Sequence, residues 1–379
     1  MAADDFLGPA RSRGFSFYAG VPCSFLAPLI DRVITADQLD YVGSASEGEA
    51  VAIAAGAWLA GRRTVVMCQN SGLGNAINPL TSLNYPFRIP TLVITTWRGQ
   101  PGFKDEPQHE LMGRITQRLL GTIEVPIAGF PKSPADVEPT LDRATEAMTE
   151  RSLPFALVME DGSVRPDGPA QSPPVSRRCA EHHVQWTRGV PPSRAKILER
   201  VLAAAPEHAA VVATTGKTGR ELFTLADRPQ HLYQVGSMGG AAGMALGLAM
   251  NTARPVIVLD GDGAALMNLG TFATIGACAP GNLVHVLLDN GVYDSTGGQS
   301  TTSSVVDFST VALACGYSHV AGCDSVDAFD ALFKAALGAR GPCFIHTRIA
   351  PGSMNGLGRP TIPPHEVARR FRNFVTTPM

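Results

Sequence analysis

The sequence predicts an α/β protein of two domains, each built on a doubly wound parallel sheet. Short runs rich in Val, Ile and Leu alternate with helical patterns along the chain, as in parallel sheets covered by helices. A chain of 379 residues is long enough for two such domains. Hydrophobic residues at 45% and charged residues at 17% indicate compact, well-buried layers and not a disordered chain.

The elements recur in the same order in both halves. The clearest strands are expected at 63–69, 90–97 and 154–161, and then at 209–216, 255–263, 282–290 and 341–348. Helical patterns cover 133–150, 192–205, 239–252, 267–278 and 325–338. A stretch rich in Pro, Ser and Arg separates the halves. We therefore predict domains at 1–165 and 191–379, joined by a linker at 166–190.

Charge, cysteine content and hydropathy exclude several classes of function. The net charge of −2 gives no basic surface for nucleic acid, so no nucleic-acid partner is expected. Seven scattered cysteines without a CxxC pair are expected to be free thiols in a reducing compartment. No apolar run is long enough to span a membrane, and the first residues do not form a signal peptide. We expect a cytoplasmic protein with no membrane partner.

A motif of one acid between two glycines is the strongest chemical signal. Gly261-Asp262-Gly263 follows the apolar run PVIVLD, and Asn290 follows the next run. Both should emerge at the carboxyl edge of a parallel sheet, where open α/β folds bind ligands. A carboxylate and an amide oxygen suit Mg²⁺ carrying a diphosphate, and the glycines admit backbone N–H groups to phosphates. In isolation the motif is also typical of a turn, and Asn290 of a helix cap.

The segment from this motif to YDSTGGQST resembles the cofactor-binding signature of thiamine diphosphate enzymes, in which GDG is followed by one or two asparagines. The resemblance implies that Asp262, Asn290 and the backbone carbonyl of Val292 bind Mg²⁺. The usual paired asparagines read Asp289-Asn290 here.

A thiamine enzyme also needs a buried carboxyl that meets the aminopyrimidine ring of the cofactor. Glu47 and Glu49 begin a long Ala-rich helical pattern after Ser44 and Ser46, which are good capping residues. Acidic residues in a first helical turn are also ordinary partners of the helix dipole. The family spacing to Gly56 identifies Glu47 as the catalytic acid. Glu49 is assigned to the cap or to a structural hydrogen bond.

The motifs KDEPQH, TTGKT, GSMG and STGGQ, in this order, closely resemble phosphonopyruvate decarboxylases over nearly the whole chain. The resemblance implies thiamine diphosphate- and Mg²⁺-dependent decarboxylation of 3-phosphonopyruvate to phosphonoacetaldehyde and CO₂. The pathway would be phosphonate biosynthesis, which includes antibiotic biosynthesis. The two domains would be the pyrimidine-binding and the diphosphate-binding domain, without the middle domain of the large decarboxylases.

Three other functions are compatible with parts of this pattern. Sulfopyruvate decarboxylase is the nearest relative and shares the two-domain plan. A thiamine-dependent carboligase acting on a small 2-keto acid normally carries the missing middle domain. A non-catalytic thiamine-binding protein would be expected to lack Glu47, which is present.

The resemblance also implies the residues that surround the cofactor. Met238 would hold the cofactor in its bent shape, although a core methionine is the alternative. The other cofactor-binding residues would be Thr215, Gly216, Gly236, Gly239, Gly261, Gly263, Ala264, Ser295, Thr296 and Gly297.

Polar residues between 67 and 113 are candidates for binding a small anionic 2-keto acid. NSGLGNAIN should leave a strand, form a glycine loop and begin a helix, whose first residues Asn70 and Ser71 can hold an anion. The following loop, RGQPGFKDEPQHE, carries Arg98, Lys104 and His109. Arg98 or Lys104 would bind the phosphonate and His109 would carry or polarise a proton. A solvated loop is the alternative.

The resemblance finally implies a homo-oligomer, at least a dimer, with each active site across a subunit interface. Glu47 of one subunit would then meet the cofactor bound through Asp262 of another. Val367, Phe371 and Phe374 lie at helical spacing near the C-terminus, a stripe suited to a neighbouring subunit or to packing within its own domain.

Overall fold

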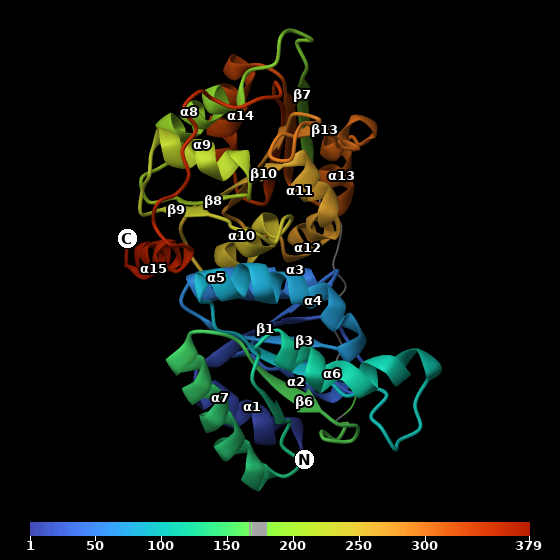
Figure 1. Cartoon of the computed structure of the whole chain (residues 1–379). Helices are drawn as coiled ribbons and strands as arrows, with labels where there is room; N and C mark the ends of the chain where they lie inside the picture. The colour runs from blue at the N-terminus through green and yellow to red at the C-terminus, as the bar shows by residue number, and fades with distance from the viewer. Residues whose placement is uncertain (167, 169–179) are drawn as a thin grey trace. The chain divides into compact units, whose positions relative to one another are not determined.

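The computed structural model describes residues 1–166, 168 and 180–379, and Figure 1 shows how the elements follow one another. They form two compact units, Met1–Trp58 with Arg62–Pro174, and Leu59–Gly61 with Val175–Met379. Each unit contains one main sheet in which all neighbouring strands are parallel. The predicted α/β class with two parallel-sheet domains is therefore confirmed.

The first unit has a six-stranded sheet with the order β2-β1-β3-β4-β6-β5. Its strands are β1 (Phe15–Gly20), β2 (Asp40–Gly43), β3 (Arg63–Cys68), β4 (Leu92–Thr96), β5 (Ile127–Gly129) and β6 (Phe155–Met159). Its helices are α1 (Ala3–Ser12), α2 (Ala27–Ile34), α3 (Glu47–Leu59), α4 (Leu73–Pro79), α5 (Tyr85–Phe87), α6 (Glu110–Thr122) and α7 (Val137–Arg151). Short turns of other helix types occupy Asn70–Gly72, Leu80–Asn84, Pro107–His109 and Pro134–Asp136.

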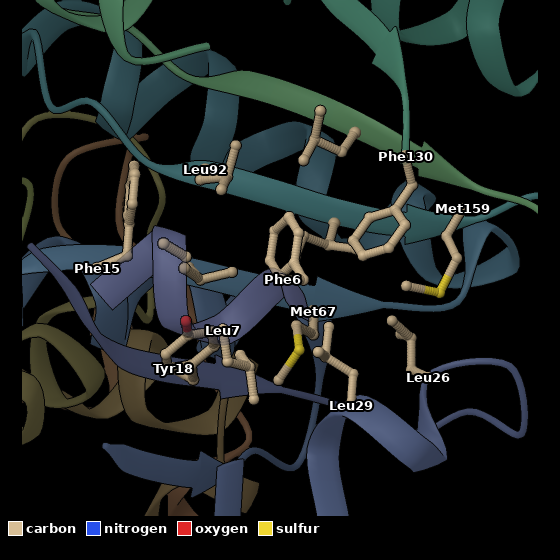
Figure 2. Packing of buried hydrophobic residues seen from close by; sticks show 14 of the residues in the cluster. Phe6, Leu7, Phe15, Tyr18, Leu26, Leu29, Met67, Leu92, Phe130 and Met159 are labelled. Carbon is tan, nitrogen blue, oxygen red and sulfur yellow. The ribbon is translucent and has the colours of Figure 1, made fainter. Parts of the chain in front are cut away.

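The core of the first unit lies between one face of this sheet and three helices. Phe6 and Leu7 of α1, and Leu29 of α2, pack with Val137 and Leu141 of α7 against the sheet. Figure 2 shows Phe6 beside Phe130 in this cluster, and their ring centroids are 4.6 Å apart. Burial of each large apolar side chain contributes about 1.5–3 kcal/mol. Helix α3 lies on the opposite face of the sheet (Figure 1).

The second unit has a seven-stranded sheet with the order β7-β14-β15-β11-β10-β8-β9. Its strands are β7 (Glu181–Gln185), β8 (Ala210–Ala213), β9 (His231–Tyr233), β10 (Val256–Gly261), β11 (Leu283–Asp289), β14 (His319–Cys323) and β15 (Cys343–Arg348). A small antiparallel pair, β12 (Val292–Tyr293) and β13 (Gln299–Ser300), follows β11, and a short 3₁₀ turn occupies Ser303–Val305. Its helices are α8 (Arg194–Ala204), α9 (Lys217–Leu225), α10 (Ala241–Ala249), α11 (Asp262–Met267), α12 (Gly270–Cys278), α13 (Phe308–Cys315), α14 (Val326–Gly338) and α15 (Pro364–Thr376).

All seven strands predicted from apolar runs are present, as β3, β4, β6, β8, β10, β11 and β15. The five predicted helices correspond to α7, α8, α10, α12 and α14. Helices cover both faces of the second sheet, with α8, α9 and α14 in one layer and α10, α12 and α13 in the other (Figure 1).

The segment 166–190 is not a linker throughout. Residues 181–185 form β7, which pairs in parallel with β14 at the edge of the second sheet. All five residues of β7 are exposed, so this edge strand has no apolar run from which it could be predicted. Residues 167 and 169–179 of the predicted linker lie outside the described residues.

Two further expectations can be compared with the structure. Six cysteines are free thiols, and Cys179 lies outside the described residues. The C-terminal stripe packs within its own unit, because Val367 and Phe371 of α15 are buried and α15 contacts β9. Within the described residues, no helix is long and apolar enough to cross a membrane.

Candidate active site

The second sheet reverses its winding direction between β8 and β10. The chain passes from β8 outward to β9 and then returns to the other side of β8 to form β10 and β11. The carboxyl ends of β8 and β10 therefore border the crevice in which open parallel sheets bind ligands. Thr214 follows β8 and Asp262 follows β10, so two of the sequence motifs meet here.

A cavity of about 170 Å³ opens at this crevice. It brings together all three predicted metal ligands, which are Asp262, Asn290 and Val292. It is also lined by the predicted cofactor-binding residues Thr215, Gly216, Met238, Gly261, Gly263, Ala264, Ser295 and Thr296. Met238 is only partly buried, which differs from a core methionine.

Asp262 is buried at the start of α11, and among the described residues no cation forms an ion pair with it. Its Oδ2 accepts a hydrogen bond of 2.5 Å from the Thr301 hydroxyl. Burial raises the pKa of Asp262, and the negative charge of Asp289 raises it further. A divalent cation would remove this penalty, so the chemistry of the site fits a metal.

The turn after β11 holds the other two predicted ligands. The Asn290 amide nitrogen donates to Asp294 Oδ2 at 2.6 Å, and its Oδ1 accepts from the Val292 backbone N–H at 3.2 Å. Among the described residues, no cluster of three His, Cys, Asp or Glu side chains could hold a metal. A metal here would therefore be bound by amide and carbonyl oxygens in addition to the one carboxylate. Hard cations are commonly bound by such oxygen ligands.

The glycines of the motif differ in what surrounds them. A β-carbon at Gly263 would overlap the Tyr293 ring, so this glycine serves internal packing. A β-carbon at Gly261 would meet only the Thr214 methyl group, at 3.9 Å. Gly261 therefore leaves open space beside the cavity, as the predicted approach of a phosphate requires.

Three predicted cofactor residues are absent from the described lining of the cavity. They are Gly236, Gly239 and Gly297. A β-carbon at Gly239 would lie 2.9 Å from the Ala264 carbonyl oxygen, so its packing explains the glycine. Gly236 and Gly297 both have positive φ, which suits turns.

Seven residues that the sequence did not single out also line the cavity. They are Arg194, Thr214, Lys217, Thr218, Leu288, Tyr293 and Asp294. Thr214, Lys217 and Thr218 belong to the TTGKT motif and could have been found there. Arg194 lies in an ordinary amphipathic helix, and nothing in its local sequence indicates a site.

In the first unit, Glu47 is buried at the start of α3. Its Oε2 accepts a hydrogen bond of 2.8 Å from the Asn75 amide. A β-carbon at Gly72 would overlap the Glu47 carboxylate, so Gly72 makes room for this group. Glu49 has the predicted capping role, because its N–H donates to Ser46 Oγ and its Oε2 accepts from the Ala45 N–H.

Asn70 is fully buried where the chain leaves β3. Its amide nitrogen donates to the Arg98 carbonyl and to Thr116 Oγ1, at 2.8 and 2.9 Å. Its Oδ1 accepts from the Arg98 N–H and from Thr96 Oγ1. These bonds use both donors and both acceptor positions of the amide, so the Asn70 side chain joins two loops and has no free polar atom for the predicted substrate contact.

Asp105 organises the loop that carries the predicted cations. Its carboxylate accepts two hydrogen bonds from the Arg98 guanidinium, at 2.5 and 2.8 Å. It also accepts from the Gly99 N–H at 2.7 Å and interacts with His109 Nδ1 at 3.1 Å. The Arg98 pair holds the pKa of Asp105 well below its usual range. Arg98 is therefore largely neutralised, which favours a structural role for it.

His109 is buried between Asp105 and Gln69, a residue that the sequence did not single out. Its Nε2 lies 3.3 Å from Gln69 Nε2, which also donates to Ser71 Oγ at 2.5 Å. Gln69 Oε1 accepts from the Cys23 thiol at 3.1 Å. The structure thus brings together His109 and Ser71 through one amide.

Lys104 projects from the same loop and is exposed. Within the described residues, it forms no ion pair with Asp105, Glu106 or any other acid, and Asp105 is paired with Arg98. The surface ion pair that could explain this lysine is therefore not formed.

Comparisons with known proteins agree with this division of the chain. The model of the N-terminal TPP binding domain of thiamine pyrophosphate enzymes matches residues 2–118. The model of their C-terminal TPP binding domain matches residues 214–347, the part that contains the cavity. Within the described residues, the chain divides into these two units and no third.

Two similar proteins and one similar structure illustrate the likeness. A phosphonopyruvate decarboxylase of Streptomyces hygroscopicus is 51% identical over 380 residues, which cover 100% of this chain and 95% of the relative. A sulfopyruvate decarboxylase of Methanosarcina acetivorans is 30% identical, over 96% of this chain and 94% of the relative. A benzoylformate decarboxylase of Polynucleobacter necessarius has a similar fold, with a TM-score of 0.74 at 14% identity, over 93% of this chain and 100% of its own.

Proposed function

We propose that this chain, which belongs to the phosphonopyruvate decarboxylases among the thiamine pyrophosphate enzymes, converts 3-phosphonopyruvate to phosphonoacetaldehyde and CO₂. It is a carboxy-lyase by family. The observation that carries the proposal is the cavity at the β8–β10 crevice, where the metal ligands predicted from the sequence line one space. The proposed pathway is phosphonate biosynthesis.

The second unit would hold the diphosphate of the cofactor through Mg²⁺. Asp262, Asn290 and the Val292 carbonyl are the proposed ligands. The fit rests on the buried Asp262 carboxylate, which no described cation neutralises, and on the open space beside Gly261. Lys217 and the first turn of α9 also line the cavity and favour an anion there.

Thiamine diphosphate, when bound, supplies an electron sink for the electron pair that departing CO₂ leaves behind. The protein's part is to hold and orient. Glu47, buried with Asn75 as its hydrogen-bond donor, would hold a proton for the aminopyrimidine ring. Met238 would support the cofactor from within the cavity.

The substrate would be bound by the loop of the first unit that follows β4. Lys104 is the proposed phosphonate ligand, because it is exposed and carries no ion pair, whereas Arg98 is neutralised by Asp105. His109 and Ser71, joined through Gln69, are the proposed polar contacts to the reacting end. A cation at the phosphonate and none at the carboxylate would leave CO₂ free to depart.

The proposed assembly is a homo-oligomer of at least two subunits. Glu47 belongs to the first unit and Asp262 to the second, and both groups are needed at one cofactor. We place them in different subunits of the oligomer, as the family resemblance implies.

The metal site is tested by the substitution Asp262→Ala. Removal of the only carboxylate among the proposed ligands should weaken Mg²⁺-dependent binding of thiamine diphosphate by more than about 100-fold and abolish decarboxylation. Titration calorimetry at fixed Mg²⁺ measures the affinity, and Asp307→Asn, which alters a helix cap in the same unit, is the control. Cofactor affinity like that of the wild type would remove Asp262 from the metal site.

A second candidate function, sulfopyruvate decarboxylation, is favoured by the 30% identity to the Methanosarcina enzyme. A phosphonate and a sulfonate differ in charge, but both are tetrahedral groups with three oxygens. The same lysine would therefore bind either group. Parallel steady-state assays with phosphonopyruvate, sulfopyruvate and pyruvate decide between them. The highest kcat/KM is expected with phosphonopyruvate, and a higher value with sulfopyruvate would replace the assignment.

A further inference from the structure

The amide of Asn290 is bonded so that its two ends are distinguishable. Its Nδ2 lies 2.6 Å from Asp294 Oδ2, and its Oδ1 lies 3.2 Å from the Val292 backbone nitrogen. An ionised carboxylate only accepts hydrogen bonds, and a backbone N–H only donates. Together they select one of the two orientations of the amide.

This orientation matters if Asn290 binds a metal, because only the amide oxygen can be a ligand to a hard cation. The reversed amide would present its NH₂ group instead, and the two forms have nearly the same shape. The Asn290 oxygen that accepts from Val292 has a second lone pair, which stays available to a metal. Asp294 therefore controls which atom of Asn290 is offered.

Arg194 in turn holds Asp294. Its Nη2 donates to Asp294 Oδ2 at 2.6 Å, and its Nη1 donates to Glu221 Oε1 and to the Gly352 carbonyl, both at 3.1 Å. The side chains of Arg194 and Asp294 are only 5% and 11% exposed. The Gly352 N–H also faces the Asp294 carboxylate, at 3.2 and 3.3 Å. The carboxylate is thereby held in one position.

We propose that Asp294, held by Arg194, is a positioning residue that orients the Asn290 amide with its oxygen as the metal-binding atom. This inference rests on the proposed metal site and adds residues outside its ligand set. In this role Asp294 acts through the Asn290 amide, and Arg194 acts through Asp294.

The test compares two substitutions of Asp294. In Asp294→Ala the amide at 290 loses the carboxylate to which its nitrogen donates, so the Mg²⁺ concentration that half-saturates cofactor binding should rise about 10- to 100-fold. In Asp294→Asn the amide oxygen can replace Oδ2, which accepts from both Asn290 and Arg194, so most of the Mg²⁺ affinity should be kept. Calorimetry with thiamine diphosphate measures the Mg²⁺ dependence of both variants.

Controls separate positioning from loss of folding and from failure of the metal site. Thermal unfolding without cofactor gives the midpoint of each variant, and the Mg²⁺ dependence is measured at a temperature at which both variants are folded. Wild-type Mg²⁺ dependence in Asp294→Ala, or an Asp294→Asn protein no better than Asp294→Ala, would overturn the inference. If Asp262→Ala also kept wild-type Mg²⁺ dependence, the proposed metal site itself would be overturned.

Discussion

The Glu47 carboxylate lies in a space that is open only because residue 72 is a glycine. Gly72 approaches it so closely that a β-carbon there would overlap the carboxylate, while Asn75 donates to its Oε2. Both partners lie on the turn and helix that follow β3, so the position of the acid depends on a segment outside its own helix. At the scale of single residues, contacts of this kind decide what each group can do.

The substitution Gly72→Ala should displace the Glu47 carboxylate and lower kcat strongly. The backbone at Gly72 has φ −84°, which alanine adopts without strain, so the effect would come from the side-chain overlap. Gly74→Ala is the matched control, because a β-carbon there meets nothing within 4 Å. Equal kcat values for the two variants in a steady-state assay would show that Glu47 does not need this space.

Lys104→Ala should lower kcat/KM for phosphonopyruvate about 10- to 100-fold, as expected when a charged hydrogen bond is lost. Residual activity on pyruvate should change little, because pyruvate has no phosphonate. Lys132→Ala, an exposed lysine that pairs with Glu160, is the control. A loss of equal size for both substrates would contradict the phosphonate assignment.

At the scale of elements, the start of β9 buries an ionisable side chain. His231 begins β9 and is buried, with its Nδ1 3.1 Å from the Ala226 carbonyl oxygen. Burial lowers the pKa of His231 from 6.5 to about 4. The neutral ring can donate to that carbonyl, which fits an uncharged histidine in the folded state.

This histidine should make the stability of the second unit depend on pH. Below pH 6.5 the unfolded chain takes up a proton at His231, whereas the folded chain does so only near pH 4. Stability should therefore fall by up to about 3 kcal/mol as the pH falls from 6.5 to 4, with no further loss from this group below that. Denaturant unfolding of His231→Gln should show a smaller slope over this range, while His365→Gln, at a more exposed site, should keep the wild-type slope. Identical slopes for all three proteins would refute the assignment.

At the scale of the whole molecule, each unit places its polar groups at the point where its sheet reverses direction. In the first sheet β1 lies between β2 and β3, and Cys23, Gln69 and His109 meet near the ends of β1 and β3. In the second sheet the equivalent crevice is the cavity that contains Asp262. Two sheets of the same winding thus present two sets of polar groups, and the proposed metal ligands belong to the second.

The proposed oligomer predicts complementation between inactive variants. Glu47→Gln mixed with Asp262→Ala and reassembled should recover activity, because a hybrid interface combines an intact Glu47 with an intact Asp262. For a dimer mixed in equal amounts, about one quarter of the wild-type activity is expected. Proven subunit exchange without recovery would mean that each active site lies within one chain.

The sequence by itself determined the class of fold and the residues at the ends of the strongest strands. Asp262 and Asn290 follow β10 and β11, whose apolar runs are plain in the chain, and neighbouring parallel strands end at one edge. The cap and the helical pattern predicted the helix that Glu47 and Glu49 begin, and the family spacing to Gly56 distinguished Glu47 from Glu49. These features are local, so a short window of sequence carries them.

Only the tertiary structure decided which groups are free to act. Arg194 and Asp294 are 100 residues apart in the chain but form a hydrogen bond. Asp105 forms an ion pair with Arg98, and Lys104 stays exposed. The side-chain amide nitrogen of Asn70 donates both of its hydrogen bonds within the protein, to the Arg98 carbonyl and to Thr116 Oγ1. The edge strand β7 has no apolar run, because all its residues are exposed. Pairing between distant side chains depends on how the elements pack, and a local pattern of apolar residues does not record it.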